Sequence, residues 1–113
     1  MKHFLLLYTF ADGYLERRTQ FREGHLTHAW DAHDRGDLLL AGALADPVDT
    51  GLLVFTTESR ETVEEFARND PYVINGLVTA WRVRGWTTAV GATAASPVYP
   101  ADLPNSSKTG AKQ

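Results

Sequence analysis

The chain of 113 residues is 43% hydrophobic and 22% charged, values that fit one globular domain and exclude a disordered or fibrous chain. Its formal net charge of −3 at pH 7 argues against nucleic-acid binding, which needs a basic surface, and the absence of cysteine excludes disulfides and thiolate chemistry. The longest apolar run, residues 4–7, is far too short for a membrane span, and the first residues lack the pattern of an export signal. We therefore expect a cytoplasmic protein that binds neither membrane nor nucleic acid.

The first part of the chain predicts a strand followed by a helix. Residues 3–10 are apolar on both alternating faces, which is typical of a central strand. Residues 15–35 follow a helical period, and Gly36 is suited to end the helix in a left-handed conformation. Gly24 inside this helix indicates either that the helix begins near it or that another segment packs against its backbone. The expected stripe on one face of this helix consists of Leu26, Ala29, Trp30 and His33.

The next segments predict a hairpin, a second helix and a last strand. Residues 38–44 and 51–57 are short apolar runs joined by turn-forming residues. Ser59 is a suitable N-cap for a helix that ends before Pro71, because proline disfavours helical geometry in the residue before it. Residues 77–87 alternate again as a strand. The expected buried side chains of the second helix are Val63, Phe66 and Ala67.

This order of elements predicts an α+β fold of the ferredoxin-like type, βαββαβ, with an antiparallel sheet and both helices on one face. The sheet face without helices is too apolar to face water, so we expect a homodimer that packs through this open face. The domain is expected to span residues 1–87, followed by an extension rich in Ala, Thr, Ser and Pro over residues 88–113. Composition alone indicates a disordered extension; an ordered one would lie on the partner subunit or a neighbouring molecule, anchored by Val98, Tyr99 and Leu103.

Two short motifs carry residues suited to proton transfer. Arg22 and His25 lie three positions apart and share a face of the predicted helix, where an imidazole can exchange protons and a guanidinium can bind an oxyanion. The spacing equally fits Arg22 paired with Glu23 and a His25 that only packs. Asp70 is expected at the C-terminal end of the second helix, where the helix dipole disfavours a carboxylate and an imidazole partner would stabilise it. Alternatively, Asn-Asp-Pro simply ends the helix.

Other chemistries have little support in the sequence. His25 and His28 share a helix face, but no third ligand stands at metal-binding spacing, so no metal site is predicted. No serine has a nucleophile-elbow context, and the glycines form no phosphate-binding loop. Arg82 and Arg84 on one strand face are more typical of a solvated edge than of a substrate clamp.

Several short segments together carry a family resemblance. In chain order they are residues 3–10, Arg22-x-x-His25-Leu26, Gly36-Asp37-Leu38, Gly42, Ala45-Asp46-Pro47, Gly51, Asp70-Pro71-Tyr72 and Gly76. This pattern resembles the YciI-like (YCII-related domain) family of small dimeric α+β barrel proteins over residues 1–87. The resemblance implies a homodimer, a cleft that contains His25 and Asp70, and Arg22 as the neighbouring basic group. It also implies cofactor-independent lyase or dehydrochlorinase-type chemistry on hydroxylated aromatics, for which we predict Tyr72 as a further substrate-binding residue.

The expected mechanism is general acid–base catalysis. Asp70 would orient His25, His25 would move a proton on a small hydroxylated or halogenated aromatic substrate, and Arg22 would stabilise oxyanion charge, with no metal, flavin or nucleotide required. The pocket is expected beside the open sheet face, near the dimer seam. Two alternatives remain: a ligand-binding or regulatory module that uses the same pocket without turnover, and an accessory subunit that has no pocket.

Overall fold

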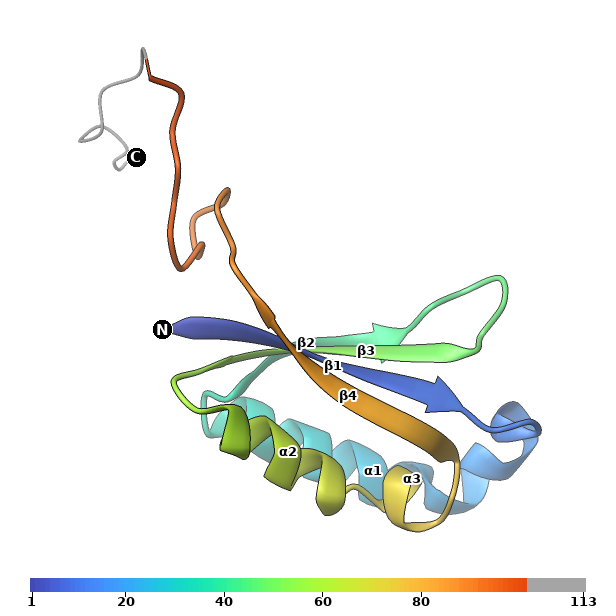
Figure 1. Cartoon of the computed structure of the whole chain (residues 1–113). Coiled ribbons are helices and arrows are strands. Elements are labelled where there is room, and N and C mark those ends of the chain that lie inside the picture. The colour runs from blue at the N-terminus through green and yellow to red at the C-terminus, as the bar shows by residue number, and fades with distance from the viewer. Residues whose placement is uncertain (102–113) are drawn as a thin grey trace.

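The computed structural model describes residues 1–101, which form one four-stranded antiparallel sheet with three helices on one of its faces (Figure 1). The strand order is β2-β3-β1-β4. In chain order the elements are β1 (Lys2–Phe10), α1 (Tyr14–Asp34), β2 (Leu38–Ala43), β3 (Thr50–Thr57), α2 (Arg60–Arg68), α3 (Pro71–Ile74) and β4 (Val78–Trp86). The α+β, ferredoxin-like prediction is therefore confirmed, with α3 as an element that the sequence did not predict.

β1 lies between β3 and β4, as its two apolar faces predicted. On the helix side, Phe4, Leu6 and Tyr8 are buried, while Leu5 and Leu7 on the other side are only partly covered. Side chains alternate across a strand, so the same nine residues supply both the core and the open face.

α1 buries only one residue of the expected stripe, Ala29. Its buried residues are Tyr14, Ala29 and Ala32. Leu26 and Trp30 are 39% and 60% exposed, and His33 is also exposed, so these three members of the expected stripe lie outside the core. The helix packs against the sheet through alanines, which allow close approach, and its larger apolar side chains lie beside this contact.

The link between α2 and β4 decides where the functional residues lie. Ser59 caps α2 as predicted, and the chain then leaves the helix at Asn69 and begins α3 at Pro71. Asp70 is the N-cap of α3 and accepts a hydrogen bond from the Tyr72 backbone, so its expected place at an unfavourable helix C-terminus is wrong. Pro71 packs on α1 at Gly24, where an added Cβ would stand 3.4 Å from Pro71 Cγ, which explains the mid-helix glycine by packing.

The segment after β4 is tied to the start of the chain. His3 Nδ1 lies 2.7 Å from Thr88 Oγ1, and the Val98 backbone donates to Ala89 O. Val98 and Tyr99 are exposed in the single chain, and Leu103 lies outside the described residues. Docking of this segment, the 87/88 domain boundary and a homodimer through the open sheet face all stay predictions. In the described part of the chain, no helix is long and apolar enough to cross a membrane.

Candidate active site

Asp70 is the buried centre of the candidate site, with a fully inaccessible side chain. Three donors reach its carboxylate. The Tyr8 hydroxyl donates to Oδ2 at 2.7 Å, the Tyr72 backbone N–H donates to Oδ1 at 3.0 Å, and His25 Nδ1 lies 2.8 Å from Oδ1 and 3.1 Å from Oδ2. A buried carboxylate with this many donors is held in one orientation. Asp70 thereby connects β1, α1 and α3 at one point.

His25 is fixed on two sides. Its ring stacks on the Tyr72 ring, with centroids 3.8 Å apart and planes 5° from parallel, and its side chain is 16% exposed. A carboxylate only accepts hydrogen bonds, so Nδ1 carries the hydrogen and Nε2 is the basic nitrogen of the neutral ring. Within residues 1–101, His25 Nε2 makes no hydrogen bond. The imidazole is therefore oriented by Asp70 and Tyr72 and has one nitrogen free to exchange a proton.

Two tyrosines around this pair are held in the neutral form. Burial, the charge of Asp70 and the hydrogen bond to it together raise the pKa of Tyr8 far above the ordinary value. Burial and the neighbouring Tyr14 raise the pKa of Tyr72 to about 12, while the positive charges of Arg22 and Arg18 act in the opposite direction. Tyr8 thus serves as a donor to Asp70 at every physiological pH.

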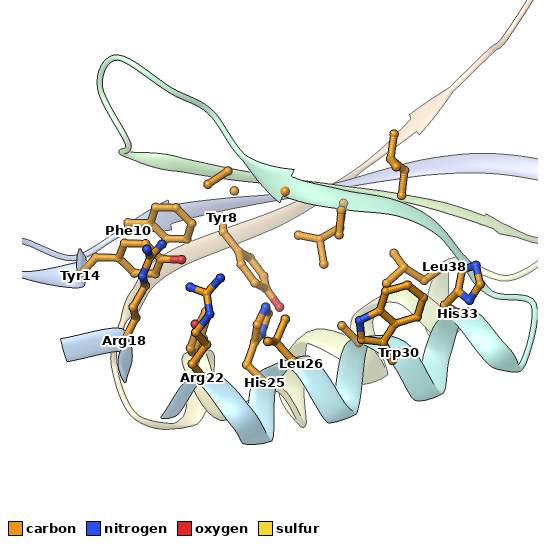
Figure 2. Close-up of a pocket in the computed structure, with 18 of the residues that line it drawn as sticks. Tyr8, Phe10, Tyr14, Arg18, Arg22, His25, Leu26, Trp30, His33 and Leu38 are labelled. Atoms are coloured by element: carbon orange, nitrogen blue, oxygen red, sulfur yellow. The ribbon is translucent and has the colours of Figure 1, made fainter. Parts of the chain in front are cut away.

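A cavity of about 510 Å³ opens beside His25 (Figure 2). It lies between α1 and the helix-facing side of the sheet at β2 and β3, and its residues include His25, Arg22 and Tyr72. The expected position beside the open sheet face is therefore wrong. Ala29 on α1 and Gly51 on β3 are too small to fill the gap between helix and sheet, so the hollow forms on this side.

The structure brings all four predicted site residues together. Arg22 and Tyr72 line the cavity with His25, and Asp70 lies directly behind the imidazole. Among the described residues, Arg22 forms no ion pair with Glu23, so the alternative pairing expected from the sequence is not adopted. The accessory-subunit alternative, which required a closed site without a pocket, does not fit this geometry.

The remaining histidines have other surroundings. His28 Nε2 lies 2.9 Å from Phe66 O, and His33 Nδ1 lies 3.3 Å from Asp34 Oδ1. Across residues 1–101, no group of three or more His, Asp or Glu side chains is placed to hold a metal ion.

Sequence reasoning missed Tyr8, Tyr14 and Arg18. Tyr8 could have been found, because a tyrosine at an inward position between apolar residues needs a partner for its hydroxyl. Arg18 stands one helical turn before Arg22 and also lines the cavity, and its guanidinium lies 5.8 Å from the Tyr14 ring centre. The spacing of Arg18 and Arg22 was available in the sequence, but the direction in which they point was not.

The fold and the cavity define a ferredoxin-like α+β domain with a pocket between its first helix and its sheet. The chain belongs to the YCII-related domain family, whose family model matches residues 1–87. Among solved structures, it is similar to 5-chloro-2-hydroxyhydroquinone dehydrochlorinase (TftG) from Burkholderia phenoliruptrix AC1100 in complex with 2,5-dihydroxybenzoquinone. That similarity has a TM-score of 0.66 and 22% identity, over 77% of this chain and 95% of that one.

A second similar structure is protein Atu4242 from Agrobacterium tumefaciens, with a TM-score of 0.53 and 13% identity over 79% of this chain and 94% of that one. No curated protein matches the chain. At these identities the two solved structures support the fold, and the family assignment rests on the match over residues 1–87.

Proposed function

We propose that the protein is a cofactor-independent lyase in which His25 acts as general base on a small hydroxylated or halogenated aromatic substrate. One observation carries the proposal: His25 is held through Nδ1 by buried Asp70 at 2.8 Å, while its other nitrogen is free and the side chain lines a cavity. A base needs a fixed orientation, a defined tautomer and access to the substrate, and this arrangement supplies the three together.

The proposed reaction is the loss of hydrogen chloride from the ketone form of a chlorinated hydroxyaromatic ring. His25 Nε2 takes a proton from the ring carbon next to the C–Cl carbon. The electron pair of the C–H bond becomes a C=C double bond, and chloride leaves with the pair of the C–Cl bond. Asp70 stabilises the imidazolium, which returns its proton to water, and Arg22 stabilises the charge on the ring oxygen. The step is a proton transfer coupled to departure of a leaving group, so it consumes no oxidant or reductant.

The substrate class is suggested by the similar Burkholderia protein, a 5-chloro-2-hydroxyhydroquinone dehydrochlorinase in complex with 2,5-dihydroxybenzoquinone. The polar and aromatic groups around the cavity agree with such a ligand. The lining includes aromatic rings and the hydroxyl-bearing side chains of Tyr8, Tyr14 and Tyr72.

The test is chloride release from a panel of chlorinated hydroquinones with and without a ring carboxylate, measured by ion chromatography. We expect His25→Ala to reduce kcat by about 100-fold or more, the usual contribution of a general base. Asp70→Asn is expected to reduce it by at least tenfold, because the amide no longer fixes the same tautomer. His28→Ala is the matched control, since His28 lies on the same helix, is bonded to a backbone oxygen and stays outside the cavity lining.

Turnover that survives in His25→Ala would refute the proposed mechanism. Tight binding of the panel by the wild-type protein with no chloride release would instead place it in the alternative class, a small-ligand-binding or regulatory module.

A further inference from the structure

The cavity has a charge distribution that the proton transfer does not explain. Its lining contains two arginines, Arg18 and Arg22, and no Asp or Glu, although the chain as a whole carries a net charge of −3. Within residues 1–101, neither guanidinium forms an ion pair or a hydrogen bond with a protein group. On the helices outside the cavity, by contrast, Arg17 donates to Asn75 O and Arg68 pairs with Glu61.

Arg18 and Arg22 both extend toward one end of the cavity (Figure 2). Arg18 and Arg22 are four residues apart on α1, a separation of about 6 Å along the helix axis, so their side chains leave the same face. Arg18 lies over the Tyr14 ring, and both positive charges act on the Tyr72 hydroxyl. In Figure 2, Arg18 and Arg22 reach from α1 toward the sheet on one side of His25, with Tyr14 and Phe10 beside them.

The opposite end of the cavity is mostly apolar. Beyond His25, the wall is formed by Leu26, Trp30, Leu38 and Leu53, with the His33 ring beside Trp30, and Trp30 presents an indole that is 60% exposed in the single chain. Figure 2 shows Trp30 and Leu38 on the side of His25 away from the arginines. A ligand that fills the cavity therefore meets positive charge at one end, the free imidazole nitrogen of His25 in the middle and a mostly apolar surface at the other end.

We propose that Arg18 and Arg22 form a carboxylate-binding subsite, so that the natural substrate is a carboxylate-bearing aromatic molecule rather than a neutral phenol or quinone. Guanidinium groups match the planar, two-oxygen geometry of a carboxylate and can bind it through paired hydrogen bonds. Two such groups at one end of the cavity fix the direction in which the ring enters and bring the reacting carbon over His25. This inference rests on the proposed function for the ring chemistry, but the anion subsite is testable without turnover.

The test compares two ligands that differ in charge. Binding of 2,5-dihydroxybenzoate and of 2,5-dihydroxybenzamide is measured by isothermal titration calorimetry. We expect the wild-type protein to bind the carboxylate about tenfold or more tightly than the amide, since a charge-assisted hydrogen bond supplies at least that factor. Arg18→Gln and Arg22→Gln should each remove most of this preference. Arg17→Gln removes the same charge from the same turn of α1 but outside the cavity lining, and it should leave the preference unchanged.

Four results would overturn the subsite: no binding of the carboxylate at millimolar concentration, equal affinity for the two ligands, an equal loss in Arg17→Gln, or a full preference retained in Arg18→Gln. Circular dichroism of each variant and binding of the amide show whether the cavity is intact. His25→Ala separates this proposal from the catalytic one. If His25→Ala keeps the preference for the carboxylate, the result supports the subsite, whatever the turnover of this variant. The chloride release of His25→Ala tests only the role of His25 as general base.

Discussion

Removing the Tyr8 hydroxyl tests whether the buried carboxylate depends on it. In Tyr8→Phe, Asp70 loses the donor that lies 2.7 Å from Oδ2, while the ring keeps its place in the core. A hydrogen bond to a charged group contributes about 1.5–3 kcal/mol, so we expect a loss of about 2 kcal/mol in the free energy of unfolding at pH 7. Tyr99→Phe is the control, because this side chain is 41% exposed and is expected to change stability by less than about 0.5 kcal/mol.

The same variant has a defined pH dependence. Burial raises the pKa of Tyr8 in the folded protein, so above pH 10 the unfolded chain loses the tyrosine proton while the folded chain keeps it. The stabilisation from Tyr8 is therefore complete below about pH 10 and declines above it, by about 1.4 kcal/mol at pH 11. Tyr8→Phe lacks this titration. The difference in the free energy of unfolding between the wild-type protein and Tyr8→Phe should therefore fall to roughly 0.6 kcal/mol at pH 11.

Urea denaturation followed by tryptophan fluorescence at pH 7, 9 and 11 measures both quantities. A penalty below about 0.5 kcal/mol at pH 7 would refute the contribution assigned to the hydrogen bond. If the loss in the free energy of unfolding in Tyr8→Phe stays constant from pH 7 to pH 11, the buried, neutral state of the Tyr8 hydroxyl is refuted.

Two glycine substitutions test the packing that shapes the site. Gly51→Ala would place a Cβ 2.9 Å from Phe10 Cζ and 3.2 Å from Tyr8 Cβ, so we expect a loss of about 1–3 kcal/mol in urea denaturation; an unchanged midpoint would contradict the close contact. Gly24→Ala would bring its Cβ into ordinary contact with Pro71 at 3.4 Å and should raise stability by about 0.5–1 kcal/mol, because alanine favours the helix. A lower thermal midpoint in Gly24→Ala would mean that α1 and α3 pack too tightly for any side chain there.

Local patterns predicted most of the fold because they depend on neighbouring residues only. The alternation of residues 3–10 placed β1 in the middle of the sheet, and Ser59 and Gly36 marked the beginning of α2 and the end of α1. α3 was missed because four residues are too few to show a period, although Asp70-Pro71 is a typical start of a helix.

The sequence did not show which residues of the α1 stripe are buried, for a related reason. The helical period grouped Leu26, Ala29, Trp30 and His33 on one face. A helix that packs closely on a sheet needs small side chains at the contact, so Ala29 is buried there, together with Ala32. The displaced large side chains became one wall of the cavity, which lies on the helix side of the sheet instead of the open side.

In the candidate site, too, some residues could be selected from the sequence, whereas others depend on contacts between segments far apart in the chain. Residue types and the family resemblance were enough to select Arg22, His25 and Asp70 from the sequence. The packing of β1, α1 and α3 decided two further features. It brings the Tyr8 hydroxyl to Asp70, and it places Arg18 beside Arg22 at one end of the cavity. Contacts between residues separated by 45 or 62 positions leave no periodic signal in one sequence, because their energies depend on the distance and direction that the complete fold imposes.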